Sequence, residues 1–155
     1  MVLGSCHSLM NVAGDLVGDP LEQASFSATA WLLTATGGTP AFSGTIGGSS
    51  MNVQHVVKHH FNSELKRMSV IARVVHKGQE SYYVFAKGAP EVMQRLMKDC
   101  PPDFEARHRQ FAAQGSRMIA LACKQLPLDT SAAAMKKLAR DEVRPAFVAV
   151  TELDA

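Results

Sequence analysis

The spacing of apolar side chains predicts a helix near the start of the chain. Within residues 20–34 the apolar positions recur at helical spacing, so one face of the segment is apolar and the other polar. These positions are Leu21, Ala24, Ala28, Trp31 and Leu32. Asp19 suits the N-cap, Pro20 suits the first helical position, and Glu22 stands where a capping box places its acidic partner. We therefore expect a helix that begins at Pro20 and fades near Thr34.

Runs of β-branched and aromatic residues predict that most of the remaining structure is strand. Such runs lie at residues 51–61, 66–76, 80–87, 117–125 and 146–153. Lys77-Gly78-Gln79 between the second and third runs is typical of a hairpin turn. Further helices are expected at residues 91–98, 103–114 and 131–143, with Asp103 and Thr130 as caps of the last two. This mixture predicts an α+β fold, with a largely antiparallel β-sheet flanked by helices.

Residues 36–50 are rich in Gly, Ser and Thr, a composition that predicts a flexible loop. The glycines lack both the Gly-Lys-Ser/Thr ending and the GxGxxG spacing of phosphate-binding loops, so an insertion is the better interpretation. We expect residues 37–49 to be removable with little loss of stability. The length of 155 residues fits one domain, residues 1–155.

Composition and charge exclude several classes of protein. With 46% hydrophobic and 19% charged residues, the chain is not globally disordered. A net charge of +2 gives no reason to expect nucleic acid as a partner. The 3 cysteines are widely spaced, which favours a reducing compartment over a disulfide framework. Residues 24–51 lie within the longest charge-free stretch and are too polar to span a bilayer, and we find no signal peptide, so we do not expect this chain to insert into a membrane.

The histidines at positions 55, 59 and 60 raise the alternative of a metal site. A regular strand would place His55 and His59 on one face and His60 on the other, and no CxxC or HExxH motif accompanies them. We expect polar strand histidines here and no metal ligands.

Four segments are candidates for a binding site. They are Gly-Asp-Pro-Leu-Glu at 18–22, Phe61 with Lys-Arg-Met-Ser-Val at 66–70, Lys-Gly-Ala-Pro-Glu at 87–91, and Gly-Ser-Arg-Met-Ile-Ala at 115–120. Each residue also has a structural explanation when it is taken alone. Glu22 could only complete a capping box, Phe61 could be a core aromatic, the two lysines could be solvated strand ends, and Arg117 could form a surface ion pair.

In this order, the four segments resemble the nucleotide-binding signatures of the N domain of P-type ATPases, the pumps that pass through an aspartyl phosphate. Lys-Gly-Ala-Pro-Glu is the most recognisable of these strings. Cys-His-Ser-Leu at 6–9 and Cys-Pro-Pro-Asp at 100–103 resemble the type V pumps, and Ala89 within the Lys-Gly-Ala-Pro-Glu string is more similar to subtype A, the endoplasmic-reticulum branch. The resemblance runs from about residue 6 to about residue 122.

The resemblance implies an ATP site with a base end and a phosphate end. Its residues would be Glu22, Phe61, Lys66, Met68, Lys87, Gly88 and Arg117. Phe61 would stack on adenine, and Glu22 would accept a hydrogen bond from the adenine amino group. A capping box accepts Gln as well as Glu at position 22, so Glu22→Gln is expected to leave the melting temperature nearly unchanged.

The remaining residues of this set would serve the ribose and phosphates. Lys66 and Lys87 would line the nucleotide cleft as cations, and Arg117 would reach the phosphate side with its planar fork. Gly88 would leave room for the base and ribose to approach the backbone.

The family's Asp-Lys-Thr-Gly string, which carries the phosphorylated aspartate, does not occur in this sequence. The resemblance therefore implies that this chain presents ATP without hydrolysing it, that it contains no catalytic residue, and that Mg²⁺ is needed only in the full pump. The implied partners are the phosphorylation and actuator domains of the parent pump, at the cytosolic side of an intracellular membrane such as the endoplasmic reticulum. We expect the isolated chain to be a monomer.

Two alternatives remain at this stage. One is an interaction or regulatory module that keeps the fold but has little affinity for nucleotide. The other is a small independent enzyme, for which the sequence offers no nucleophile–base pair or metal cluster.

Overall fold

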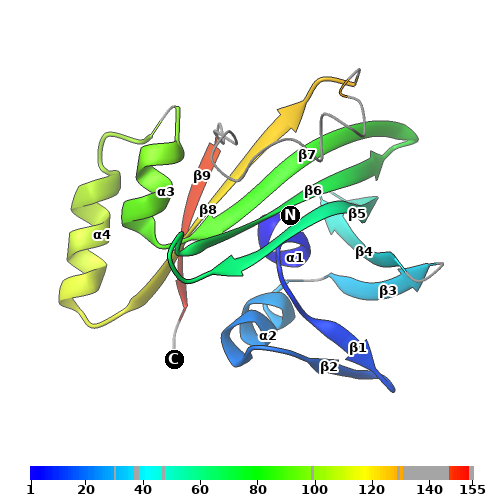
Figure 1. The fold of residues 1–155 in the computed structure, drawn as a ribbon, viewed down its shortest axis with the longest axis horizontal. Coiled ribbons are helices and arrows are strands. Elements are labelled where there is room, and N and C mark those ends of the chain that lie inside the picture. Colours follow the sequence, from blue (N-terminus) through cyan, green and yellow to red (C-terminus); the bar gives the residue numbers. More distant parts are fainter. Residues whose placement is uncertain are drawn as a thin grey trace.

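An antiparallel meander of strands forms the centre of the molecule (Figure 1). The computed structural model describes residues 1–29, 31–36, 39–46, 48–98, 100–128, 130 and 147–153. Within them, each strand of a 7-stranded sheet pairs with the next strand along the chain. These strands are β3 (Leu32–Thr36), β4 (Thr39–Ile46), β5 (Ser49–Asn62), β6 (Arg67–His76), β7 (Gln79–Gly88), β8 (Arg117–Leu126) and β9 (Phe147–Leu153). The predicted α+β fold with a largely antiparallel sheet is confirmed.

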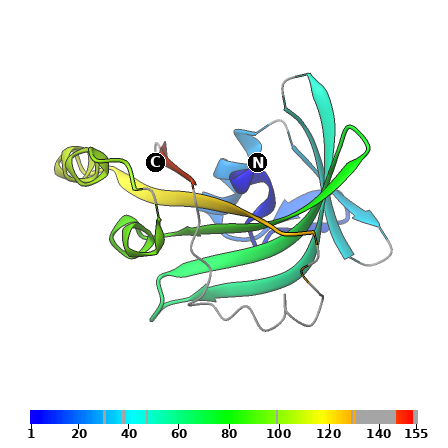
Figure 2. The same cartoon turned by 90° about the horizontal axis from the view of Figure 1, so that it is seen from above.

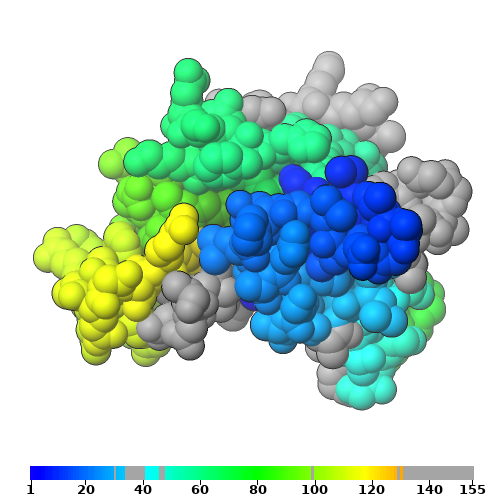
Figure 3. Space-filling view, turned by 90° about the horizontal axis from the view of Figure 1, so that it is seen from below, coloured from blue at the N-terminus to red at the C-terminus, as the bar shows by residue number. Residues whose placement is uncertain are grey.

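The two faces of the sheet are covered by different parts of the chain. The first face packs against the N-terminal segment, which contains α1 (Val2–Ser5) and α2 (Pro20–Ser27). A separate two-stranded hairpin, β1 (Met10–Val12) with β2 (Asp15–Val17), joins these helices and lies with α2 on the outer surface (Figure 3). The second face packs at one end against α3 (Pro90–Leu96) and α4 (Phe104–Ala113). These two helices lie together, to the left of α1 and α2 in Figures 1 and 2.

Alternation along β6 and β7 assigns their side chains to these faces. Met68, Val70 and Phe85 belong to the core cluster on the first face. Ala86 belongs to the cluster with Met93 of α3 on the second face. Because successive strand residues point to opposite faces, Lys87 projects on the first face, away from α3.

The hairpin turn between β6 and β7 is confirmed. His76 pairs with Gln79, and the two residues between them have positive φ angles, 51° at Lys77 and 76° at Gly78. This is the backbone twist that two-residue hairpin turns require, and glycine adopts it without steric cost.

The helix predicted from residue 20 to about residue 34 is shorter than expected. Asp19 caps it as predicted, since its side chain accepts from the backbone N–H groups of Leu21 (3.0 Å) and Glu22 (3.1 Å). The helix ends at Ser27, and the hydroxyl of Thr29 donates to the carbonyl of Phe26 at 2.6 Å, a local bond that competes with further helical pairing.

Trp31 therefore does not belong to a helix face. Its side chain is 6% exposed and packs against the backbone of Gly4 and Gly44. A Cβ atom at Gly4 would lie 2.6 Å from the indole, and one at Gly44 would lie 2.5 Å from it. Both glycines are thus needed for the close approach of an aromatic ring.

The prediction of a flexible loop at 36–50 is wrong for the described part of that segment. Residues 39–46 form β4, which pairs with β3 on one side and β5 on the other, and β5 begins at Ser49. Phe42 of β4 is 1% exposed and belongs to the main core, so deletion of this segment would remove core structure. Gly44 had suggested flexibility, whereas it provides space for Trp31.

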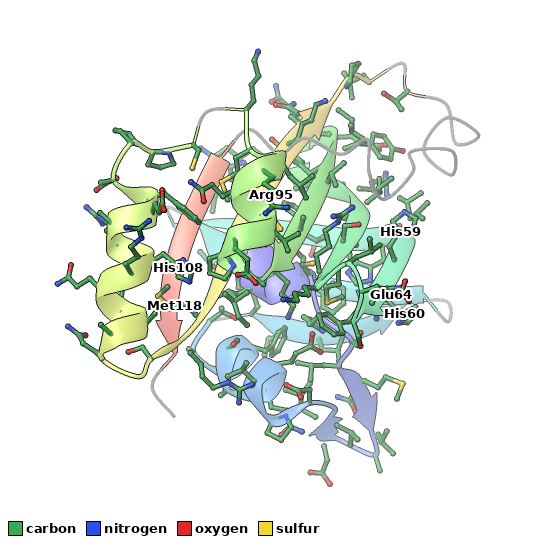
Figure 4. All side chains as sticks on the ribbon, turned by 60° about the vertical axis from the view of Figure 1, so that its left-hand side comes forward. His59, His60, Glu64, Arg95, His108 and Met118 are labelled. Carbon is green, nitrogen blue, oxygen red and sulfur yellow. The ribbon has the colours of Figure 1, made fainter. Side chains whose placement is uncertain are left out.

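The predicted arrangement of the strand histidines is also wrong. The register of β5 against β6 shifts between His55 and Val57, so Val56 is the extra residue of a β-bulge. His55 pairs with Ala72 and His59 pairs with Ser69, three residues apart on β6, so the two histidines lie on opposite faces. His60 is exposed and is labelled in Figure 4 near the end of β5.

The other predicted elements hold with small shifts at their ends. The expected helices at 91–98 and 103–114 are α3 and α4, but Asp103 makes no side-chain cap and instead pairs with Arg107 at 2.6 Å. The strands at 117–125 and 146–153 are β8 and β9. The helix expected at 131–143 lies outside the described residues, and the single-domain boundary stays a prediction.

Candidate functional site

The candidate site residues gather at one end of the sheet because four strands begin or end there. Asn62 at the end of β5 pairs with Arg67 at the start of β6, and Arg67 pairs with Gly88 at the end of β7. Gly88 in turn pairs with Ala120, near the start of β8. The meander thus brings together segments that are widely separated in sequence. Phe61, Lys66, Met68, Lys87, Gly88 and Arg117 all lie in or next to these strand ends.

Glu22 of α2 meets this strand end through an ion pair that has little exposure to water. The distance from Lys87 Nζ to Glu22 Oε1 is 2.8 Å, and the two side chains are 8% and 14% exposed. The other carboxylate oxygen, Oε2, accepts from the backbone N–H of Ser8 at 2.8 Å. The interpretation of Glu22 as a capping-box partner is therefore wrong, because its carboxylate bridges the N-terminal segment and β7.

Met68 and Cys6 form the apolar surroundings of this ion pair. Met68 pairs with Lys87 across β6 and β7 and is 2% exposed. The Cys6 thiol lies 3.6 Å from the carbonyl oxygen of Phe85, and burial raises the pKa of this thiol to about 12. The thiol is thus a packed core group without thiolate character.

Lys58 is a neighbour of the site that the sequence did not reveal. Lys58 of β5 pairs with Val70 of β6, which lies two residues from Met68 along that strand, and its side chain is on the same face as Lys87. Burial lowers the pKa of Lys58, while the nearby charge of Glu22 opposes this shift. The signal was hidden because the bulge at Val56 changes which residues of β5 face the N-terminal segment.

Gly88 is needed for contact within the protein. A Cβ at this position would lie 2.6 Å from the carbonyl oxygen of Lys66 and 2.7 Å from Cβ of Arg67. The same carbonyl of Lys66 accepts from the N–H of Ala89 at 3.0 Å. The space that we expected Gly88 to leave for a ligand is therefore occupied by the start of β6.

Gly88→Ala is expected to destabilise the protein by about 1–3 kcal/mol, because backbone atoms on β6 cannot yield to the added methyl group as a side chain could. Urea unfolding of the two proteins, followed by circular dichroism, measures this difference. Equal stability would mean that the carbonyl of Lys66 can move at no cost and that Gly88 has another role.

Lys66 lies in the turn between β5 and β6 in an unusual backbone conformation. Its φ angle is 47°, in the left-handed region that non-glycine residues seldom adopt. Its ammonium group pairs with the carboxylate of Glu91, in the first turn of α3, at 3.4 Å. The structure thus joins Lys66 to the Lys-Gly-Ala-Pro-Glu segment through both its backbone and its side chain.

Phe61 and Arg117 are exposed at the same end of the sheet. Phe61 is 61% exposed, which excludes the alternative that it is a core aromatic. Arg117 begins β8 four residues before Leu121, which pairs with Lys87, so it shares the face of Lys87 by strand alternation. The structure places both residues at the site's end of the sheet without joining them to the Glu22–Lys87 pair.

A cavity of about 380 Å³ lies at the opposite end of the sheet. It is lined by Met1, Met51, Val74, His76, Gln79, Ser81, Tyr83 and Gln125. None of the candidate residues contributes to it. The candidate site is therefore an open strand end and does not coincide with this cavity.

The described residues offer neither a metal centre nor a membrane-spanning helix. No group of three or more His, Cys, Asp or Glu side chains there has an arrangement that could hold a metal ion. Among the helices that the structure describes, none is both long and apolar enough to cross a bilayer.

Comparisons with known proteins identify relatives over most of the chain. The family model described as P-type ATPase, cytoplasmic domain N, matches residues 5–151. A probable manganese-transporting ATPase, PDR2, from Arabidopsis thaliana is 41% identical over 142 residues, which cover 92% of this chain and 11% of the relative. The endoplasmic reticulum transmembrane helix translocase of Saccharomyces cerevisiae is 31% identical, covering 92% of this chain and 11% of the relative. The probable cation-transporting ATPase 13A5 of Homo sapiens is 34% identical, covering 91% and 12%. The chain thus spans about a tenth of the length of these relatives.

Proposed function

Because the chain belongs to the P-type ATPase family and corresponds to the cytoplasmic domain N of type V pumps, we propose that it binds ATP where β5, β6, β7 and β8 meet. The observation that carries the proposal is the gathering of the candidate residues at this end of the sheet. An exposed aromatic ring and two exposed cations there match the two chemical parts of a nucleotide.

The base is held by Phe61 and by the wall that Glu22 and Lys87 form. Phe61 offers an exposed face for stacking, worth about 1–3 kcal/mol per base. Each oxygen of Glu22 already accepts one hydrogen bond, from Ser8 or from Lys87. A carboxylate has about four lone-pair sites, so the adenine amino group adds a donor without displacing either partner.

The phosphates extend toward the exposed cations at the same end. Lys66 and Arg117 are both exposed, and neither is enclosed in the core. A guanidinium group binds two phosphate oxygens at once, and an ammonium group adds a point charge. With the remaining phosphate contacts supplied by other domains, binding to this chain alone is weak.

ATP is expected to bind with a dissociation constant on the order of 0.1 to a few mM, because this chain contacts only the base and part of the phosphate chain. Titration followed by NMR shifts of backbone amides measures it and also locates the site. Absence of any shift at 20 mM ATP would favour the alternative of an interaction module with little nucleotide affinity, and saturation at nanomolar ATP would contradict the proposed partial site.

Phe61→Ala is expected to weaken ATP binding by about 1–3 kcal/mol, or roughly 5- to 150-fold, through loss of stacking. The fold should be unchanged because Phe61 is 61% exposed. Val12→Ala is a matched control, since Val12 is another exposed apolar residue, on β1. ATP binding that survives Phe61→Ala, or an unfolded variant, would remove Phe61 from the site.

In the parent pump, the chain presents the γ-phosphate of ATP to the aspartate of the phosphorylation domain through domain closure. The actuator domain is the second cytosolic partner, and ATP hydrolysis coupled to transport belongs to the whole pump. Relatives named as endoplasmic reticulum translocases support a position on the cytosolic side of that membrane. The isolated chain turns over no ATP.

Two carboxylates at this end of the sheet, those of Glu22 and Glu91, already have partners in the structure. The oxygens of Glu22 are paired with Lys87 and with the N–H of Ser8, and the carboxylate of Glu91 is paired with Lys66. A Mg²⁺ ion requires free oxygen ligands in octahedral geometry. The metal that accompanies ATP takes its protein ligands from other domains of the pump in this proposal.

A further inference from the structure

The side chain of Lys66 is held on the α3 side of the sheet. Its ammonium group contacts Glu91, and α3 packs through Met93 against Ala86 and Ala120 on the second face. The Glu22–Lys87 pair lies on the first face. Lys66 is therefore drawn away from the face on which the base is proposed to bind.

The backbone of Lys66 is fixed, so only its side chain can change position. The carbonyl oxygen accepts from the N–H of Ala89 and packs against Gly88. Lys66 follows the end of β5 by a short turn, and its own strand begins at the next residue. From this anchored position in the turn, at the end of both strands, a flexible four-carbon side chain can reach toward either face.

The pair between Lys66 and Glu91 is easily broken. The two side chains are 59% and 50% exposed, and the distance of 3.4 Å is long for a charge-assisted hydrogen bond. Exposed pairs of this kind contribute little to stability, so a triphosphate chain can compete for the ammonium group. A hydrogen bond from its own backbone N–H lowers the pKa of Glu91 most, Lys66 lowers it further, and His108 of α4 adds a smaller effect. Figure 4 shows His108 on α4 and Arg95 on the neighbouring α3.

We propose that Glu91 is a competing carboxylate that occupies Lys66 in the empty site and is displaced by the phosphate chain of the nucleotide. This proposal rests on the proposed ATP binding. It assigns Glu91 a role in specificity: the carboxylate lowers affinity for the nucleotide in proportion to the charge of the phosphate chain. Glu91 thereby favours the release of nucleotide after phosphate transfer.

The test is to measure the affinities of adenosine, AMP, ADP and ATP for the wild type and for Glu91→Gln at low salt. ATP binding is expected to tighten about threefold, the size of effect that one exposed ion pair carries. The gain should decrease from ATP to AMP and vanish for adenosine, which has no phosphate to reach Lys66. In a Lys66→Gln background, Glu91→Gln should give no gain.

Glu105→Gln is the matched control. Glu105 lies in the first turn of α4 and pairs with Arg109, so the substitution removes the same charge from an equivalent exposed position without touching Lys66. An equal gain in Glu105→Gln would show a general charge effect and overturn the proposal. So would a gain that includes adenosine, a gain that persists without Lys66, or weaker ATP binding in Glu91→Gln. If ATP binds the wild type normally and Glu91→Gln changes nothing, only this inference fails; if no nucleotide binds the wild type, the proposed function fails with it.

Discussion

Lowering the pH from 7 to 5 is expected to reduce the free energy of unfolding by about 4 kcal/mol, because two histidines are neutral in the folded core. His7 is 1% exposed and His55 is 9% exposed, with ring centroids 6.5 Å apart. Burial lowers the pKa of His7 to about 3, helped by the positive charge of Lys87. Burial likewise lowers the pKa of His55 to about 4, although its bond to the carbonyl of Ser5 opposes the shift.

The sign of this effect follows from which state binds protons. The unfolded histidines take up protons near their ordinary pKa of about 6.5, whereas the folded ones stay neutral until much lower pH. The contribution of the two histidines to the free energy of unfolding is therefore full above pH 6.5, and it is lost as the pH falls toward 4. Each histidine contributes about 1.4 kcal/mol per pH unit in this window, or about 2 kcal/mol each between pH 6.5 and 5.

Urea unfolding at pH 5, 6, 7 and 8 measures this dependence. His60→Gln is the control, because His60 is an exposed histidine of the same strand as His55 and should leave the slope unchanged. His55→Gln should roughly halve the slope. A free energy of unfolding that is constant between pH 5 and 7 would mean that the two histidines take up protons over the same pH range in the folded and the unfolded protein.

Glu22→Gln is expected to destabilise the protein by about 3 kcal/mol, because it leaves the buried ammonium group of Lys87 without an opposite charge. From the sequence alone, the same substitution is expected to leave the melting temperature nearly unchanged. The contacts of Glu22 reverse that expectation, since its carboxylate serves Lys87 and Ser8 and not the helix cap.

A double variant separates the charge from the packing. Glu22→Gln with Lys87→Met removes both charges and should recover much of the lost stability, because no unpaired buried charge remains. Glu91→Gln, which breaks an exposed pair, should change stability by less than about 1 kcal/mol. Thermal unfolding of the three variants gives the comparison. If the Glu22→Gln variant has the same melting temperature as the wild type, the ion pair is not needed for the fold.

Local patterns predicted the parts of the fold that depend on local sequence. Runs of β-branched and aromatic residues predicted β6 and β7. The turn at Lys77 and Gly78 between them has the backbone that a two-residue hairpin needs. The cap of α2 by Asp19 is also local. In each case the determining residues lie within a few positions of each other, so one sequence is enough.

The errors arose where distant contacts decide the structure. Residues 39–46 have a loop-like composition, yet they form a strand because Phe42 fills the core and Gly44 admits Trp31. The bulge at Val56 changes the face of the residues that follow it as far as His59, and alternation alone does not reveal it.

The candidate site shows the same division. The resemblance identified Glu22, Lys87 and Gly88 as neighbours of a ligand. It did not reveal that Glu22 contacts Lys87 and Ser8, or that Gly88 packs against Lys66. Such contacts join segments far apart in the chain. Their partners follow from the register of the meander, which a single sequence does not contain.

The packing of Trp31 gives this protein a built-in optical reporter. It is the only tryptophan among the 155 residues, and its indole is enclosed between the backbones of Gly4 and Gly44. An indole in such apolar surroundings emits at shorter wavelength than one in water. Intrinsic fluorescence therefore follows, without any label, whether the first helix remains seated against the fourth strand.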